Sequence, residues 1–339
     1  MIDGIIRGDL KGILSNIRKD LFEGKKVLVT GGAGFLGSWM CDVLYGIGAE
    51  VICLDDLSTG KIKNVDHLIG EKNFEFLEQD VVKLKTNEKF DYILHLASRA
   101  SPEEYQLHPI ETLLANSIGN LNVLELARRS DARVLYTSSS EVYGDTKVVP
   151  TPEDYWGNVN PVGMRSCYDE GKRFGEALFM AYYREHGLDV RIARIFNTFG
   201  PRLRADGAYA RALSRFIVQA LTNHDITVYG DGKQTRSFCY VSDTVTALFL
   251  QLTNEKAKDE VINIGNSNEI TILELAEKIK RLINSKSMIT FHPLPPDDPK
   301  RRCPNIDKAK RILGWQPRVT LDEGLTKTIR WFEKFTSAD

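Results

Sequence analysis

A tyrosine and a lysine stand four residues apart, Tyr168 and Lys172, and this spacing puts both on one face of a helix. An ammonium group beside a phenol favours the phenolate, so we expect Lys172 to lower the pKa of Tyr168. A phenolate beside a hydroxyl, such as that of Ser139, is a general base that removes a proton from an alcohol. Tyrosine–lysine pairs at this spacing are common, so the meaning of this pair depends on the elements around it.

A glycine-rich loop, GGAGFLG at 31–37, follows a β-branched run at Val27–Thr30 and precedes a predicted helix that ends near Gly46. Strand, glycine loop and helix in this order are typical of a dinucleotide site. The glycines allow a tight turn, a close approach of the backbone to a pyrophosphate and packing of the helix on the strand. The amino end of the helix would face the phosphates. We therefore expect the cofactor to contact Gly31, Gly34, Phe35, Leu36 and Gly37.

A carboxylate, Asp55, ends the second predicted strand, Val51–Leu54. At this position it can accept hydrogen bonds from the adenosine ribose hydroxyls and would repel a 2′-phosphate, so NAD is favoured over NADP. A carboxylate that only shapes a turn is the alternative. The next two strands end in further residues that we expect to contact the cofactor: Asp80, Val81, Leu96 and Ala97. His95 lies inside an apolar strand, and we expect it to pack under the cofactor and take no part in catalysis.

Strands and helices alternate through the first half of the chain. Predicted strands at Phe74–Leu77, Tyr92–Leu96, Val134–Thr137 and Arg191–Phe196 are separated by helices, including a long one at about Pro109–Arg129. This alternation predicts an α/β fold with a doubly wound parallel Rossmann sheet covered on both faces. Ligands of such sheets bind at the carboxyl ends of the strands, which is where these candidate residues stand.

The carboxyl-terminal half predicts a smaller α/β lobe that binds substrate. We expect helices at about Ala208–Leu221, 270–284 and 306–335, a strand at Thr227–Tyr229, and an irregular loop at Pro293–Pro304. A strand at Val261–Ile264 is expected to return to the first lobe, so the lobes would be discontinuous in sequence. The expected division is an amino-terminal helical arm at 1–24, an NAD-binding domain at 25–196 with a return segment at 237–264, and a substrate lobe at 197–236 and 265–339.

Composition favours a globular protein with a small-molecule substrate. A formal net charge of −1 gives no reason to expect nucleic acid or a membrane as partner. The five cysteines have no paired metal spacing, which favours reduced thiols in the cytoplasm and no metal site. Cys167 adjoins Tyr168, but no histidine is near it in sequence to make it a nucleophile. The arm at 1–24 has apolar residues every three or four positions, so we expect it to pack on the body or on a second subunit, with membrane-surface attachment as the alternative.

Six segments together resemble the extended short-chain dehydrogenases that act on nucleotide sugars. They are the glycine loop, SSSEVYG, YWGNVNP, CYDEGKR, ARIFNTFGPR and QTRSFCYVSD, in this order. The chain is most similar to the UDP-glucuronate decarboxylases, or UDP-xylose synthases, from about residue 25 to its end. The resemblance implies bound NAD and a UDP-linked sugar. It also implies a homodimer joined through the helix near Pro109–Arg129 and the helix from Tyr168.

The resemblance also implies roles for individual residues. Tyr168 matches the base and Lys172 its partner, while Ser139 matches the hydroxyl that orients the substrate. Arg302 matches an arginine at the reacting end of the sugar; its neighbour Arg301 could be confused with it. Glu141 belongs to the family's Ser–Glu pair and is expected to act in catalysis. The remaining matches contact substrate: Tyr105, Ser140, Asn197 and Arg236. Two residues come from chemistry alone: Arg211 is a cation suited to a diphosphate, and Tyr229 could stack or pack on a uracil. Each arginine could also be a solvated surface residue.

The implied reaction is decarboxylation of UDP-glucuronate to UDP-xylose through a transient 4-keto sugar. Oxidation at carbon 4 makes a β-keto acid, which loses carbon dioxide readily. The proton donor to carbon 5 is open: an arginine is too weak an acid, and Glu141 could relay a proton or hold the ring.

Two departures from the family pattern keep other reactions open. Arg99 stands where the family's loop has a proline, and it could contact a substrate carboxylate or phosphate or point to solvent. The segment 203–216 is also longer than usual. A 4-epimerase, which Arg99 would favour, is the first alternative. A 4,6-dehydratase is less favoured because Ser140 replaces an acid, and a silent NAD-binding regulator is disfavoured by the intact Ser139, Tyr168 and Lys172.

Overall fold

The computed structural model describes residues 3–206, 211–294 and 299–336. Its centre is a seven-stranded parallel sheet in the order β11-β6-β5-β4-β1-β2-β3. All the predicted strands except Thr227–Tyr229 occur in this sheet, which confirms the doubly wound α/β fold. Their bounds are β1 Lys26–Thr30, β2 Glu50–Asp55, β3 Phe74–Glu78, β4 Tyr92–His95, β5 Arg133–Ser139, β6 Val190–Ile195 and β11 Val261–Ile264.

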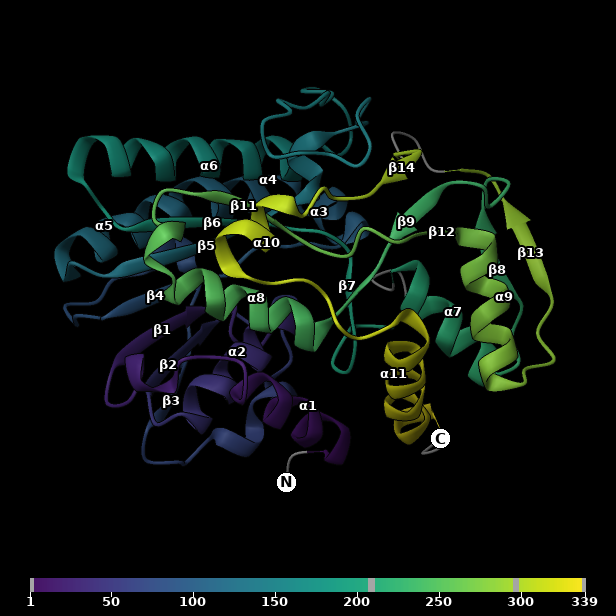
Figure 1. Cartoon of the computed structure of the whole chain (residues 1–339), viewed down its shortest axis with the longest axis horizontal. Helices are drawn as coiled ribbons and strands as arrows, with labels where there is room; N and C mark the ends of the chain where they lie inside the picture. The colour runs from purple at the N-terminus through teal and green to yellow at the C-terminus, as the bar shows by residue number, and fades with distance from the viewer. Residues whose placement is uncertain (1–2, 207–210, 295–298, 337–339) are drawn as a thin grey trace.

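Helices cover both faces of this sheet (Figure 1). One face carries α2 (Phe35–Gly46) and α8 (Val241–Thr253), and the other carries α5 (Asn120–Ser130) and α6 (Ser166–His186). Successive strand residues enter opposite cores, because side chains alternate across a strand. Val27 and Val29 belong to the core under α2 and α8, whereas Leu28 belongs to the core under α5 and α6. The sequence did not predict α8, because its apolar residues follow a strand without a clear break.

The long helix expected at Pro109–Arg129 is interrupted. The structure has α4 (Pro109–Leu114), one π-helical turn (Ala115–Gly119) and then α5. In the π turn the Asn116 amide donates to the Thr112 carbonyl at 2.8 Å and to Ser98 Oγ at 3.0 Å. A π turn is a common mark of a functional site, and this one lies against α6. Periodicity alone could not reveal it, because one extra residue shifts the apolar pattern only slightly.

The amino-terminal arm packs on the body of the same chain, in agreement with the first of the expectations for it. Its helix α1 is Gly4–Leu14, shorter than the apolar pattern suggested, and a 3₁₀ turn follows at Lys19–Leu21. Ile6, Leu10 and Ile13 are buried against α2 and α8. The buried carboxylate of Asp9 accepts from Tyr240 at 2.6 Å and pairs with Lys327 at 2.5 Å. The arm therefore uses its apolar face within the chain, which removes the argument for membrane-surface attachment.

A second group of elements follows β6 and lies to the right in Figure 1. It contains the parallel pair β8 (Ile226–Tyr229) and β13 (Ile289–His292) and the sheet β12-β9-β14. The helices there are α7 (Ala212–Leu221), α9 (Ile272–Ile283) and α11 (Leu321–Thr336), while α10 (Asp307–Leu313) packs beside β11. The remaining bounds are α3 Pro102–Leu107, β7 Thr198–Phe199, β9 Thr235–Ser237, β10 Cys239–Tyr240, β12 Glu269–Thr271 and β14 Arg301–Arg302. The proposed lobe boundaries stay predictions.

One expectation in this region is wrong. The segment Pro293–Pro304 was expected to be irregular, but Arg301 and Arg302 form β14, which pairs with Thr235 and Arg236 of β9. The partner strand is more than sixty residues away in sequence, so no local pattern could show the pairing. Residues 295–298 of this loop, and 208–210 of the helix expected at Ala208–Leu221, lie outside the described residues. Among the described helices, none has the length and apolar character needed to cross a membrane.

Candidate active site

A cavity of about 900 Å³ opens at the carboxyl ends of the large sheet's strands, between the sheet and the second group of elements. Every residue that the sequence proposed as a cofactor or substrate contact lines it. The cofactor candidates there are Gly31, Gly34, Phe35, Leu36, Gly37, Asp55, Asp80, Val81, Leu96 and Ala97. The remaining candidates are Arg99, Tyr105, Ser139, Ser140, Glu141, Tyr168, Lys172, Asn197, Arg211, Tyr229, Arg236 and Arg302.

The glycine loop has the shape that a dinucleotide needs. Helix α2 begins at Phe35, and its first turn points at the cavity. A Cβ at Gly37 would lie 2.1 Å from the Gly31 carbonyl oxygen, so helix and loop approach too closely for a side chain. Gly31 has φ of +68°, which favours glycine. The loop thus leaves backbone N–H groups and a helix amino end open to the cavity, and these residues fit a bound pyrophosphate.

Asp55 shapes this loop from below. Its carboxylate accepts hydrogen bonds from the backbone N–H of Ala33 at 3.0 Å and of Leu57 at 2.8 Å. Burial raises the pKa of Asp55 to about 6, although these backbone hydrogen bonds lower it. Asp80 similarly accepts from the backbone of Val82 at 2.9 Å. Both carboxylates line the cavity, so contact with the cofactor ribose and adenine stays a prediction, and Asp55 also has the turn-shaping role named as the alternative.

Tyr168 and Lys172 project from the first turns of α6, and both are buried. The Lys172 ammonium donates to the Thr137 carbonyl at 2.9 Å and lies 5.8 Å from the Tyr168 ring centre. Burial lowers the pKa of Lys172 to about 7. Burial also raises the pKa of Tyr168 to about 12, against a hydrogen bond with Ser139 and the charge of Arg211, which lower it. Desolvation outweighs the neighbouring charges on Tyr168 in this structure, and the lowering of its pKa expected from Lys172 stays a prediction.

A cluster of charged residues lies beside the triad of Ser139, Tyr168 and Lys172. Glu141 stands in the 3₁₀ turn Ser140–Tyr143 at the end of β5, and its Oε2 accepts from Arg302 at 2.8 Å and from Arg165. Burial alone would raise the pKa of Glu141, but Arg302, Arg165 and Arg236 outweigh burial and bring it down to about 2. The carboxylate thus stays ionised, and several cations surround it at one end of the cavity.

The choice between neighbouring arginines is clear in the structure. Arg302 is buried, lines the cavity and donates to the Gly144 carbonyl at 2.6 Å as well as to Glu141. Arg301 is exposed and pairs with Glu269 outside the cavity. The alternation of side chains along β14 separates them. This placement agrees with the preference for Arg302, whose role in the reaction stays a prediction.

Arg99 does not point to solvent, nor is its charge free. Its Nη1 lies 2.7 Å from Glu104 Oε2, and both side chains are largely buried in the cavity wall. Sequence reasoning did not single out Glu104, although it lies only five residues after Arg99. The pair neutralises the charge that could have attracted a substrate carboxylate. Contact between Arg99 and substrate stays a prediction. It no longer has the support of a free positive charge on Arg99, because Glu104 pairs with it.

The other substrate candidates line the same cavity as the glycine loop. Tyr105 stacks on Tyr168 with ring centres 5.0 Å apart, and its buried hydroxyl has no hydrogen-bond partner in the structure. Arg215 lies over the Tyr229 ring at 4.7 Å. Arg211 and Arg236 both line the cavity, and each donates to a backbone carbonyl, that of Ala100 and of Thr235 respectively. The Asn197 amide donates to the Ser237 carbonyl at 3.4 Å.

Two further polar residues of the site were missed. Arg165 joins Glu141 and lies over the Tyr105 ring, and Asp169 is buried next to Tyr168. Arg165 stands three residues before Tyr168, a helical spacing that could have drawn attention to it. His95 is buried between Thr30 and Asn120, each at 2.7 Å, and burial lowers its pKa to about 3. No cluster of histidine, cysteine and acidic residues suited to a metal occurs among the described residues.

Comparison with known proteins gives consistent matches. The profile of the NAD dependent epimerase/dehydratase family matches residues 27–265. UDP-glucuronic acid decarboxylase 1 of Danio rerio is 52% identical over 310 residues, covering 91% of this chain and 73% of that protein. The structure of UDP-glucose 4-epimerase from Thermotoga maritima, with UDP-glucose, aligns with a TM-score of 0.84 and 31% identity over 91% of this chain and 99% of that one. The structure of the dTDP-glucose 4,6-dehydratase of Streptomyces venezuelae, with NAD bound, aligns with a TM-score of 0.82 and 26% identity. The alignment covers 91% of this chain and 97% of that one.

Proposed function

The chain belongs to the NAD dependent epimerase/dehydratase family, and from this membership we propose that it is a UDP-glucuronate decarboxylase that makes UDP-xylose. The family is NAD dependent, and the residues of the glycine loop fit that cofactor. Sequence identity of about half to UDP-glucuronic acid decarboxylases supports the choice of reaction. The observation that carries the proposal is the cluster of Arg165, Arg302 and Arg236 around Glu141, beside Tyr168 and Ser139.

This arrangement supports each part of the chemistry. NAD, when bound, supplies a reversible hydride acceptor next to carbon 4 of the sugar. Tyr168 takes the proton from the hydroxyl on carbon 4, and the hydrogen bond with Ser139 positions the phenol. The resulting ketone is β to the carboxylate, so carbon dioxide leaves and the electron pair moves into an enolate. Ser139 and protonated Tyr168 donate hydrogen bonds to that oxyanion. Protonation at carbon 5 and return of the hydride complete the pentose.

The arginine cluster supports carboxylate binding in particular. A guanidinium group recognises a carboxylate by two parallel hydrogen bonds, and Arg302 and Arg165 both line the cavity next to Tyr168. Glu141 keeps these cations in place in the absence of a second anion, because an unpaired buried charge is costly. A guanidinium group is too weak an acid to protonate carbon, so the role of Arg302 is to orient the carboxylate.

The 4-epimerase alternative loses its specific support. Arg99 was the residue that would favour retention of the carboxylate, but Glu104 already neutralises it. The deciding experiment is incubation of the purified protein with UDP-glucuronate, followed by mass analysis of the nucleotide sugar. We expect a product that has lost carbon dioxide. A product of unchanged mass, UDP-galacturonate, would reject the decarboxylase proposal and support the epimerase.

We also propose the homodimer that the sequence predicted. Apolar side chains are exposed on α4, the π turn, α5 and α6: Ile110, Leu113, Leu114, Ile118, Leu121 and Phe174. Burial of these apolar side chains against a second chain would stabilise an assembly of two chains. Sedimentation at micromolar protein should give a dimer, and Ile110→Lys should shift it toward monomer. A monomeric native protein would contradict the proposal.

We further propose the cytoplasmic location that the sequence predicted. All five cysteines are free and buried, which supports this location.

A further inference from the structure

The proposed reaction, on which this inference rests, consumes a proton from solution. A carboxylate that leaves as carbon dioxide leaves its bonding electron pair on the sugar, and the product has a C–H bond at carbon 5 in its place. The proton that Tyr168 takes from the carbon 4 hydroxyl is returned when the ketone is reduced, so it cannot serve carbon 5. One new proton must therefore reach the buried end of the cavity in every turnover.

A second, smaller cavity lies beside that end. It has a volume of about 150 Å³, enough for several waters. Arg165, Arg302 and Pro299 line both cavities, so these residues form a shared wall. Asn158 and Asn160, which also line the small cavity, are exposed. The small cavity thus extends from the Glu141 cluster toward solvent.

Asp169 is the buried acid in this small cavity. Only 5% of the residue is exposed, and its Oδ2 lies 3.7 Å from Arg165 Nε. Its Oδ1 is buried with no hydrogen-bond partner among the described residues. A buried oxygen in this state is costly, and it is normally matched by a water or by a proton on the carboxyl itself. Helix α6 fixes it immediately after Tyr168.

The charged groups around Asp169 set its protonation. The pKa of Asp169 is raised to about 7. Burial is the largest cause; Glu141 and Glu170 also raise the pKa, while Arg165 and Arg302 lower it. Tyr105, from α3, also faces this carboxyl, and Asp145 lines the same small cavity. Near neutral pH a substantial fraction of Asp169 therefore carries a proton, whereas Glu141, with a pKa of about 2, carries none.

We propose that Asp169 and the small cavity deliver the proton that ends on carbon 5. The protonated carboxyl of Asp169 gives its proton to a water at the wall formed by Arg165 and Arg302. That water donates a proton to carbon 5, where the electron pair of the enolate forms the new C–H bond. Solvent then reprotonates the Asp169 carboxylate through the opening beside Asn158 and Asn160. Asp169 acts through water, so it is a positioning and proton-supplying residue that does not touch the substrate.

The test is Asp169→Asn in the protein with its bound NAD and with UDP-glucuronate as substrate. The first oxidation should proceed, whereas protonation of carbon 5 and reoxidation of the cofactor should slow by on the order of 10² at neutral pH. In the native protein that later step should slow as pH rises through about 7, since the acid must be protonated, and Asp169→Asn should lose this dependence. Asp169→Glu should restore it. Glu185→Gln, an exposed acid near the far end of the same helix, is the control and should behave like the native protein.

A second variant protects the test against a misfolded Asp169→Asn protein. Asn160→Leu keeps the acid but places an apolar side chain in the small cavity, and it should slow the same step. Native pH dependence in Asp169→Asn would overturn the inference while leaving the decarboxylase proposal standing. So would equal loss of oxidation and protonation in a folded Asp169→Asn protein, because that indicates a structural role. If the native protein releases no carbon dioxide, the proposed function fails first, and this inference fails with it.

Discussion

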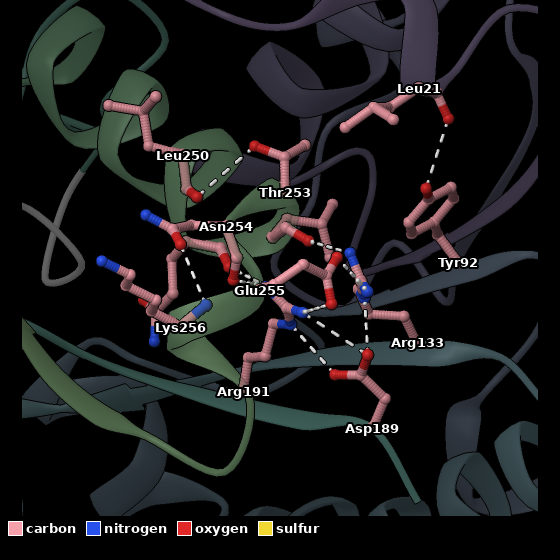
Figure 2. Close-up of polar contacts among 12 residues, drawn as sticks. Leu21, Tyr92, Arg133, Asp189, Arg191, Leu250, Thr253, Asn254, Glu255 and Lys256 are labelled. Carbon is pink, nitrogen blue, oxygen red and sulfur yellow. Dashed lines mark hydrogen bonds and ion pairs between the residues drawn. The ribbon is translucent and has the colours of Figure 1, made fainter. Parts of the chain in front are cut away.

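Buried arginines and carboxylates form clusters at both ends of the large sheet, and the two clusters differ in how fully their charges are matched. At the amino ends of β5 and β6, Asp189 lies between Arg133 and Arg191 (Figure 2). Each guanidinium nitrogen of both arginines has a partner: Asp189, Glu255 or backbone carbonyls at the end of α8. This cluster ties α8 to the sheet.

At the carboxyl ends, the cluster of Glu141, Arg165 and Arg302 borders two cavities and leaves polar atoms unmatched. The Tyr105 hydroxyl and Asp169 Oδ1 are buried there and have no hydrogen-bond partner in the part of the chain that the structure describes. Unmatched polar groups cost stability, so a protein keeps them where a ligand or a reaction uses them. Arginines and carboxylates therefore stabilise the fold at one end of the sheet and form a candidate active site at the other. The two clusters differ in that only the second borders these two cavities.

The largest effect should come from the triad at the carboxyl end. Tyr168→Phe removes the base that starts hydride transfer, so turnover of UDP-glucuronate should fall by on the order of 10²–10⁴. Thermal stability should change little, because the ring and its stacking on Tyr105 remain. Product formation and bound-cofactor absorbance measure the first effect, and a melting curve measures the second. Tyr183→Phe, on the same helix outside the cavity, is the control; substantial turnover by Tyr168→Phe would reject the assignment.

The next effect should separate oxidation from decarboxylation. Glu141→Gln and Arg302→Ala should each lower carbon dioxide release by on the order of 10²–10³ while some first oxidation survives. Single-turnover absorbance of the bound cofactor, run beside carbon dioxide detection, distinguishes the two steps. Arg301→Ala, the exposed neighbour that pairs with Glu269, should leave both steps unchanged. If Glu141→Gln and Arg302→Ala both match the native protein, the assignment of Glu141 and Arg302 is wrong.

At the amino end the opposite outcome is expected. Asp189→Ala leaves Arg133 and the fully buried Arg191 without their central carboxylate, so the free energy of unfolding should fall by about 3 kcal/mol. Activity per folded molecule should stay at the native level, because this cluster does not line the cavity. Urea denaturation gives the first quantity. The exposed pair Arg18–Asp20 provides the control, since Asp20→Ala should leave the free energy of unfolding close to the native value. A large activity loss in Asp189→Ala would break the contrast.

The smallest effect concerns Asp55, which combines cohesion with cofactor contact. Asp55→Asn keeps one acceptor for the glycine loop but removes the negative charge that repels a 2′-phosphate. The preference for NAD over NADP should shrink by about tenfold, a change of about 1.4 kcal/mol. Cofactor titration measures both affinities, and Asp56→Asn tests the neighbouring exposed acid. Equal affinity of the native protein for NAD and NADP would reject the assignment.

Local sequence determined the large sheet and the cavity's contributors. Strands such as Val27–Thr30 and Val51–Leu54 have their own apolar runs, and the loop between them has glycines where the backbone must turn. Parallel strands deliver their carboxyl ends to one edge whatever the rest of the chain does, so the residues after each strand could be assigned to one site in advance. Tyr168 and Lys172 needed only helical spacing.

Tertiary structure decided the charges and the pairings between distant segments. Arg302 reaches Glu141, 161 residues away in sequence, because β14 pairs with β9, and neither short strand has a local signature. Desolvation raised the pKa of Tyr168 and that of Asp169, because burial depends on everything packed around a group. The Arg99–Glu104 pair needed the turn that brings α3 back against the cavity. Spacing can place a titratable residue in a site, but its charge there depends on which neighbours exclude water and which supply the opposite charge.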